Sequence, residues 1–268
     1  MTHPIESSFL SDALPSYKNP PVNEVVCGMR FQVPDKLRIP HIGFLWNKFR
    51  ADYPIIQHAP PIMSVKGEII MDELAIPRVW FINKSDDQLV QFQFDRFYFN
   101  WRRRQSNYPR YDYVIRNFEK AMNNIVTFFG EFELGELKPI EYELSYINHI
   151  PKGQGWNTID DLPGIFPDFV WKQTKTRFLP NPEKIAWQAE FTFQGKKGYL
   201  IVNLKQATRT EDRVPLLVLE LKARKIGELT GKEAIREWFD LAHEWIVRGF
   251  TDLTTPEIQK IWEREDNA

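Results

Sequence analysis

The sequence predicts an α+β fold, in which mainly antiparallel sheet carries helices packed on one face. Three observations lead to this prediction. Apolar residues alternate with polar ones in a series of short stretches, the pattern of half-buried strands. Several of these stretches follow one another across short turns, which favours antiparallel pairing. Other stretches repeat apolar residues at helical spacing, so helices would cover one face of the sheet.

In the first half, the alternation of Val25, Cys27, Met29 and Phe31 with polar residues predicts a strand that ends at Pro34. A helix is expected next, and it ends at Pro54. Strands are predicted at 78–83 and 88–94, joined as a hairpin, with a shorter strand near Val65. The apolar stripe of a second helix runs from about residue 112 to residue 132.

In the second half, residues 140–146 read as a strand, followed by a long connection over residues 151–183. Three strands and a helix should follow. The sequence Thr230-Gly231-Lys232-Glu233 has the form of a capping box, which predicts the start of a helix through Phe250. A last short helix is expected to begin at Thr255-Pro256.

The order of elements is similar in the two halves of the chain. We therefore expect an extended N-terminal arm at 1–22 and one α+β domain over 23–268, with structurally similar halves at 23–135 and 139–250. No repeat is visible at the level of single residues.

Composition limits the class of protein. The net charge of −1 argues against general electrostatic capture of nucleic acid or anionic lipid. The single cysteine, Cys27, excludes an intrachain disulfide, and no apolar run reaches the ~20 residues that span a bilayer. With no secretory signal pattern at the start, we expect a cytoplasmic protein without a cofactor. The aromatic content of 14% is high, and aromatic side chains serve both cores and interfaces.

Residues 88–113 concentrate the unusual chemistry. The apolar positions change parity between Phe94 and Phe97, so a bulge or turn is predicted at Asp95-Arg96. Arginines and aromatic residues crowd the stretch that follows. The candidate ligand-binding residues from this stretch and from a later strand are Arg96, Asn100, Trp101, Arg102, Arg104, Tyr108, Arg110, Tyr111, Tyr146 and Asn148.

Three interpretations of this cluster stay open. Arginine guanidinium groups could bind phosphate, and together with stacking aromatic rings they could bind single-stranded nucleic acid. Alternatively, the arginines could pair with acidic residues such as Glu141 and Glu143 as part of the packing, or the cluster could contact a protein partner. No glycine-rich phosphate loop accompanies it, which weakens a nucleotide interpretation.

Catalysis has little support in the sequence. His149, at a strand end, is a candidate general base with Asp95 as its carboxylate partner, although a lone histidine in such a place is more often structural. The five histidines show no metal-ligand spacing, so no metal site is predicted, and His243 reads as the edge of an apolar helix face.

Several motifs resemble a sporadically distributed family of bacterial proteins of about this length and no settled function. They are Asn-Pro-Pro-Val-Asn-Glu-Val-Val-Cys-Gly-Met-Arg-Phe at 19–31, Pro-Arg-Val-Trp-Phe-Ile-Asn at 77–83, Phe-Asn-Trp-Arg at 99–102, Glu-Leu-Ser-Tyr-Ile-Asn-His-Ile at 143–150 and His-Glu-Trp-Ile-Val-Arg-Gly-Phe-Thr-Asp-Leu-Thr-Thr at 243–255. The resemblance runs over nearly the whole chain. The patchy distribution of that family implies antitoxin, immunity or phage-defence settings.

Two functions are therefore expected as alternatives. The first is an interaction module, antitoxin-like or an immunity or defence accessory protein, that binds a protein partner or a second copy of itself. The second is a binder or hydrolase of a phosphate-bearing ligand or single-stranded nucleic acid. A pocket joining Arg96 or Arg102 to His149 would favour the second function, and arginines buried against Glu141 and Glu143 would favour the first.

Overall fold

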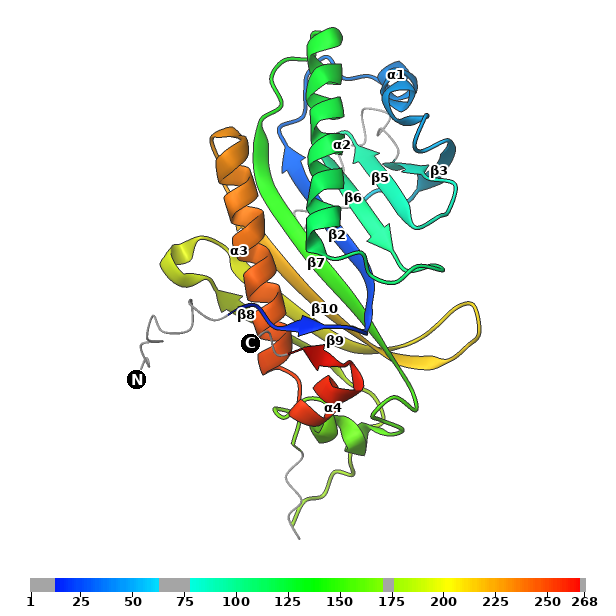
Figure 1. The fold of residues 1–268 in the computed structure, drawn as a ribbon, viewed down its shortest axis with the longest axis vertical. Helices are drawn as coiled ribbons and strands as arrows, with labels where there is room; N and C mark the ends of the chain where they lie inside the picture. Colours follow the sequence, from blue (N-terminus) through cyan, green and yellow to red (C-terminus); the bar gives the residue numbers. More distant parts are fainter. Residues whose placement is uncertain (1–12, 63–77, 171–175, 266–268) are drawn as a thin grey trace.

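A nine-stranded sheet forms the centre of the molecule in the computed structural model, which describes residues 13–62, 78–170 and 176–265 (Figure 1). All its neighbouring strands are antiparallel, in the order β3-β4-β5-β6-β2-β7-β10-β9-β8. The strands are β2 (Val22–Phe31), β3 (Ile55–Ala59), β4 (Arg78–Ile82), β5 (Gln88–Gln93), β6 (Arg96–Arg102), β7 (Pro139–Pro151), β8 (Ala186–Thr192), β9 (Tyr199–Thr208) and β10 (Pro215–Ile226).

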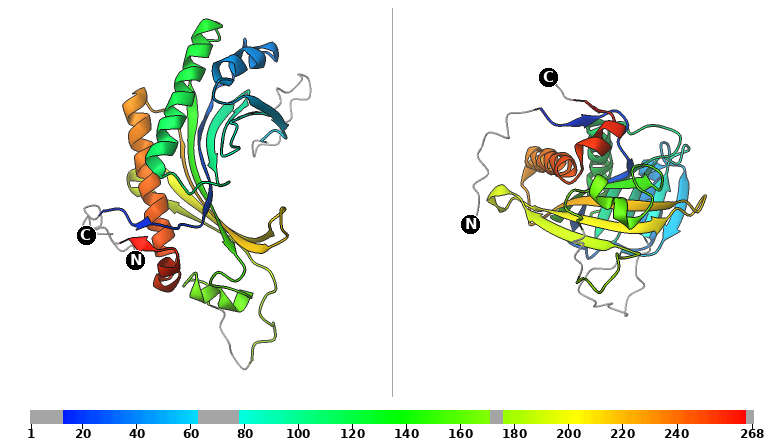
Figure 2. Two further views of the ribbon diagram at one scale, coloured as in Figure 1. Left: turned by 45° about the vertical axis from the view of Figure 1, so that its right-hand side comes forward. Right: turned by 90° about the horizontal axis from the view of Figure 1, so that it is seen from below.

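Two long helices lie side by side on one face of this sheet, and the other face carries no helix among the described residues (Figure 2). Helix α2 (Tyr111–Glu131) packs on β6 and β2, and α3 (Gly231–Asp252) packs on β10, β7 and β9. The shorter α1 (Pro40–Phe49) packs on α2. The predicted α+β fold with helices on one face is therefore confirmed.

The apolar residues of the alternating strands point to the helices. Val25, Cys27 and Met29 of β2 are fully buried there, next to Phe97 and Phe99 of β6. Burying such side chains is the main favourable term in folding, at about 25 cal/mol per Å² of apolar surface. Their polar neighbours along each strand consequently line the opposite face.

The predicted change of parity occurs in the tight turn between β5 and β6. Gln93 pairs with Arg96, so the turn contains only Phe94 and Asp95. A two-residue turn places an even-numbered residue opposite an odd-numbered one, as in the pair Phe92–Phe97. Both rings can therefore reach the same core although they differ in parity.

The two halves of the sheet follow the same order. Each half contributes its first strand, β2 or β7, to the centre of the sheet, where these two strands pair. In each half the last strand, β6 or β10, lies beside the first, and a long helix follows it. The similarity of the two halves and their residue bounds stay a prediction.

The described ends of the chain meet on the helical side. Strand β1 (Ser16–Tyr17) pairs with β11 (Arg264–Glu265), which follows the short helix α4 (Pro256–Ile261). The predicted arm is thus anchored at Ser16 and Tyr17, while its first twelve residues, like the strand predicted near Val65, lie outside the described residues.

Both predicted helix starts are confirmed, but only one of them has the predicted side-chain cap. The Thr255 hydroxyl accepts a hydrogen bond from the Ile258 amide, 3.4 Å away, and so caps α4. Thr230 makes no such bond at the start of α3, so the predicted capping box is wrong. Its backbone lies in the extended region before Gly231, which has φ 88°, and the chain enters the helix through this left-handed glycine instead.

The long connection after β7 contains the 3₁₀ helix η2 (Ile159–Gly164), and a second 3₁₀ turn, η3 (Gln194–Lys196), joins β8 to β9. In the part of the chain that the structure describes, no helix has the length and apolar character needed to cross a membrane.

Candidate functional site

The predicted ligand-binding residues fall on both faces of the sheet. Arg96, Asn100 and Arg102 point to the open face, because they alternate along β6 with core residues. Trp101 points to the helices, is 1% exposed, and packs on the Tyr108 ring. The residues predicted as one cluster therefore belong to two cavities, with Trp101 in the core between them.

The first cavity, here called the polar groove, has a volume of about 1090 Å³ on the open face. It crosses strands of both halves of the sheet. Its lining combines charged and aromatic side chains, among them Glu24, Arg30, Arg78, Trp80, Arg96, Tyr98, Asn100, Arg102, Arg104, Glu141, Glu143, Tyr199, Lys222 and Arg224.

At one end of the groove, the charges neutralise one another across four strands. Arg96 donates to both carboxylate oxygens of Asp95, at 2.7 and 2.8 Å. Arg30 bridges Asp95 to Glu141, whose second oxygen accepts from Arg224 at 2.8 Å. The acidic partner of Arg96 is therefore Asp95, the neighbouring turn residue, whereas Glu141 binds Arg30 and Arg224.

In the middle of the groove a chain of hydrogen bonds joins β4, β5, β6 and β2. The Trp80 indole donates to the Gln91 side chain at 3.0 Å, and Gln91 donates to Asn100 at 2.7 Å. Asn100 in turn donates to Glu24 at 2.6 Å. Burial raises the pKa of Glu24 despite this hydrogen bond, because a carboxylate loses its hydration there. A second buried carboxyl, Glu143, has its pKa raised by the same cause and lies 3.6 Å from Lys222.

Arg78 differs from the other arginines of the groove. Its Nε is buried and has no hydrogen-bond partner among the described residues, and its Nη1 donates to Gln91 at 3.3 Å. No salt bridge to it is found in the described part of the chain. The guanidinium lies over the Trp80 ring, 5.3 Å from the centroid, and burial lowers its pKa.

Arg102 and Arg104 share one acidic partner at the far end of the groove. Arg102 donates to both the backbone carbonyl and the carboxylate of Asp86, and Arg104 donates to the same carboxylate at 2.6 Å. Asp86 sits in the β4–β5 turn with φ 60°. These arginines tie the end of β6 to that turn.

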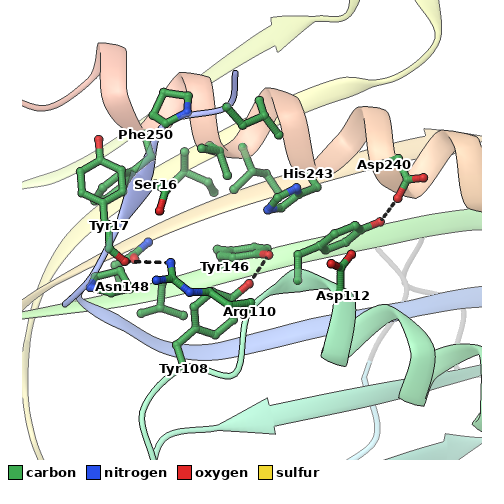
Figure 3. Close-up of a pocket in the computed structure, with 18 of the residues that line it drawn as sticks. Ser16, Tyr17, Tyr108, Arg110, Asp112, Tyr146, Asn148, Asp240, His243 and Phe250 are labelled. Carbon is green, nitrogen blue, oxygen red and sulfur yellow. Dashed lines mark hydrogen bonds between the residues drawn. The ribbon is translucent and has the colours of Figure 1, made fainter. Parts of the chain in front are cut away.

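The second cavity, here called the aromatic pocket, has a volume of about 540 Å³ on the helical side (Figure 3). Its floor is β7, one wall is α3, and the other wall is the start of α2 with the residues before it. The N-terminal residues Leu14–Tyr17 form its rim. Five predicted ligand residues line it, namely Tyr108, Arg110, Tyr111, Tyr146 and Asn148.

Aromatic contacts and hydrogen bonds fix the pocket. The Tyr111 ring stacks on His243, with centroids 4.0 Å apart and planes 6° apart, and its hydroxyl donates to Asp240 at 2.8 Å. The hydroxyls of Tyr108 and Tyr146 are hydrogen-bonded to each other at 2.7 Å. Arg110, at the rim, donates to the Tyr17 carbonyl at 2.9 Å.

His149 and Asp95, the predicted catalytic pair, lie at opposite ends of β2. The amide of His149 donates to the carbonyl of Pro21, whereas the carbonyl of Asp95 accepts from the amide of Phe31. Ten residues of strand separate these ends, which corresponds to about 30 Å at ~3.3 Å per residue. His149 lines neither cavity, and desolvation lowers its pKa.

Sequence reasoning missed several residues of both sites. Arg78 and Trp80 lie on β4, which was predicted as a strand without a functional role. His243 was interpreted as the edge of a helix face, and it does lie at such an edge, where it meets the pocket. Only the pairing of distant strands and helices brings these residues to the cavities, so no local signal could identify them. Among the described residues, no group of three His, Cys, Asp or Glu side chains is placed to hold a metal ion.

Comparisons with known proteins add no functional information. No family model matches the chain, and no curated protein matches it significantly.

Proposed function

We propose that the protein is a cytoplasmic interaction module whose polar groove binds a segment of a partner protein. The observation that carries the proposal is the composition of the groove. Arg, Trp and Tyr dominate the energetics of protein interfaces, and the groove brings Arg78, Trp80, Tyr98 and Tyr199 together around a hollow of about 1090 Å³.

The charges of the groove favour a polypeptide over a polyanion. Most arginines of the groove already bind carboxylates of the protein, as Arg30 and Arg224 bind Glu141, so they have little unneutralised charge for a phosphate group. A polypeptide has both hydrogen-bond donors and acceptors, and it can therefore pair with a groove that contains both positive and negative side chains. The antitoxin-like, immunity or phage-defence setting implied by the family resemblance is the cellular context that we propose for this binding.

Site-specific cross-linking tests the proposal. A photo-crosslinking amino acid at Tyr199 or at Ile226, both of which line the groove, should link the protein to one partner in its native host. The same amino acid at Val126, exposed on α2, should not. Arg78→Ala should release the partner, whereas Arg50→Ala, an exposed arginine after α1, should retain it. Equal linkage from groove and helix positions would contradict the proposal.

A second function is favoured by one feature of the groove: Arg78 lies over the Trp80 ring and makes no salt bridge within the described part of the chain. A phosphate oxygen could accept from its guanidinium while a base stacks on an aromatic ring. Fluorescence anisotropy with oligo(dT) at 50 and 200 mM salt tests this alternative. Binding that weakens with salt and is lost in Arg78→Ala, but not in Arg50→Ala, would support nucleic-acid binding over the partner proposal. Salt-independent or absent binding would exclude it.

A further inference from the structure

The aromatic pocket lies on the opposite side of the sheet from the polar groove and has its own chemistry. Its volume of about 540 Å³ falls within the ~300–1,000 Å³ typical of small-molecule sites. Apolar side chains of α3 line it, among them Ile246, Val247 and Phe250, and Figure 3 shows Phe250 at the pocket. A few polar groups converge on the same space, as they do in ligand sites.

Two of these polar groups have hydrogen-bonding capacity that the described residues leave unused. In the Tyr108–Tyr146 pair one hydroxyl donates to the other, so the accepting hydroxyl keeps a proton with no acceptor. Asn148 is 2% exposed, and its amide nitrogen donates to the Leu219 carbonyl. Its side-chain oxygen accepts no hydrogen bond from any described residue. The floor therefore offers one donor and one acceptor.

His243 adds a second donor and a second acceptor from the wall. Its ring is held by stacking on Tyr111 and lies 5.9 Å from the Tyr146 ring, while neither nitrogen is hydrogen-bonded to a described residue. Desolvation lowers the pKa of His243 to about 4, although Asp240 and Asp112 oppose the shift. The imidazole is consequently neutral at pH 7, with one N–H and one free nitrogen.

The charged groups around the pocket are already engaged. Arg110 binds the Tyr17 carbonyl and lies 3.9 Å from Glu265, and Arg236 pairs with Asp240 and Glu119. Asp240 also accepts from Tyr111. Both arginines that line the pocket among the described residues are thus bound to other groups of the protein, so the pocket does not favour an anionic ligand.

We propose that the aromatic pocket binds a neutral, planar nitrogen heterocycle of the nucleobase class. Such a molecule has an apolar ring face for Tyr146 and its neighbours, and it presents donors and acceptors at its edge. These would pair with the free hydroxyl proton, the Asn148 oxygen and the His243 nitrogens. The proposal does not depend on the partner proposed for the groove.

Titration of the full-length protein with free nucleobases tests this site. We expect at least one of adenine, hypoxanthine, cytosine, uracil and thymine to bind at pH 7 with a Kd below about 1 mM in calorimetry. His243→Phe preserves the stacked ring and should weaken binding at least tenfold. His58→Phe, at an exposed position on β3, is the matched control and should bind normally.

Two further measurements distinguish a ligand contact from a structural role. For a base that stays neutral at pH 4, such as hypoxanthine, uracil or thymine, binding to the wild type should weaken about twofold between pH 7 and pH 4, because about half of the His243 side chains are then protonated and lose their acceptor. Circular dichroism verifies that the protein is folded at both pH values. Inorganic phosphate should not compete. If none of the bases binds below 1 mM, if His243→Phe binds as well as the wild type, or if phosphate displaces the base, the proposal is overturned.

Discussion

The polar groove and the aromatic pocket use polar side chains in opposite ways. In the groove, nearly every charged group is bound to another group of the protein, as Glu141 is to Arg30 and Arg224. In the pocket, His243 and Asn148 each have a hydrogen-bonding atom that no described residue uses. The difference indicates that the groups of the groove mainly bind one another, whereas the pocket keeps hydrogen-bonding groups available for a ligand. Mutations in the two regions should therefore differ in their effect on stability.

The largest effect is expected from Glu141→Ala. Removing this carboxylate leaves Arg30 and Arg224 without their shared partner on a largely desolvated face, which should lower the free energy of unfolding by about 3 kcal/mol. Urea denaturation measures the loss. Glu131→Ala removes the exposed partner of Lys48 and should cost less than ~1 kcal/mol. Equal losses in the two variants would show that the groove network is no more than a surface feature.

The next effect is a dependence on pH that originates in the pocket. The pKa of His243 is about 4 in the folded protein and about 6.5 in the unfolded chain, so the unfolded state binds more protons between these values. Stability from this group is fully present above pH 6.5 and is lost as pH falls through 4, by about 2–3 kcal/mol. The raised pKa values of Glu24 and Glu143 act in the opposite direction, since their protonation on acidification favours the folded state.

The comparison of wild type with His243→Phe isolates the histidine from those carboxyls. The free energy of unfolding of the wild type, relative to that of His243→Phe, should fall as pH falls from 7 to 4, because only the wild type loses stability through His243. Denaturation curves at both pH values measure this. A difference that stays constant with pH would mean that folding does not lower the pKa of His243.

Smaller effects are expected from the tyrosine pair of the pocket. Tyr146→Phe leaves the Tyr108 hydroxyl without its partner and should cost about 1–2 kcal/mol. In the double variant Tyr108→Phe/Tyr146→Phe both polar groups are gone, so the total loss should be below the sum of the single losses. A double-mutant cycle from thermal or urea unfolding measures the coupling, and additive losses would contradict a direct hydrogen bond.

The sequence was informative wherever local pattern decides structure. Alternation identified Val25, Cys27, Met29 and Phe31 as one face of a strand, and the structure buries all four. The parity change predicted a break at Asp95-Arg96, one residue from the observed turn at Phe94-Asp95. The same pattern already separates Trp101 from Arg102, since neighbours in a strand face opposite sides. Trp101 and Arg102 were predicted to belong to one site because they are neighbours in sequence. In the structure they lie on opposite faces of the sheet.

What sequence could not supply is the pairing of distant elements. Asp86 meets Arg102 because β4 and β5 form a hairpin beside β6, and Glu141 meets Arg224 because β7 pairs with β10. His243 meets Tyr146 because α3 crosses β7. Each of these contacts follows from strand order and helix packing, which alternation alone does not specify.

The smallest loss of stability is expected from Arg104→Ala, and its comparison with Arg102→Ala tests what the arginines of the groove do. Arg102 and Arg104 both bind Asp86, but the Arg102 side chain is 14% exposed and that of Arg104 is 37% exposed. Arg102→Ala also removes a hydrogen bond to the Asp86 carbonyl, so we expect a loss of about 1–2 kcal/mol, and less than ~0.5 kcal/mol for Arg104→Ala. Thermal unfolding should show a decrease in Tm of about 2–8 °C for the first and little change for the second. If instead both variants keep the wild-type Tm while losing a bound partner, these arginines act in recognition. The arginines at this end of the groove would then be available to a ligand, as we infer for the polar groups of the pocket.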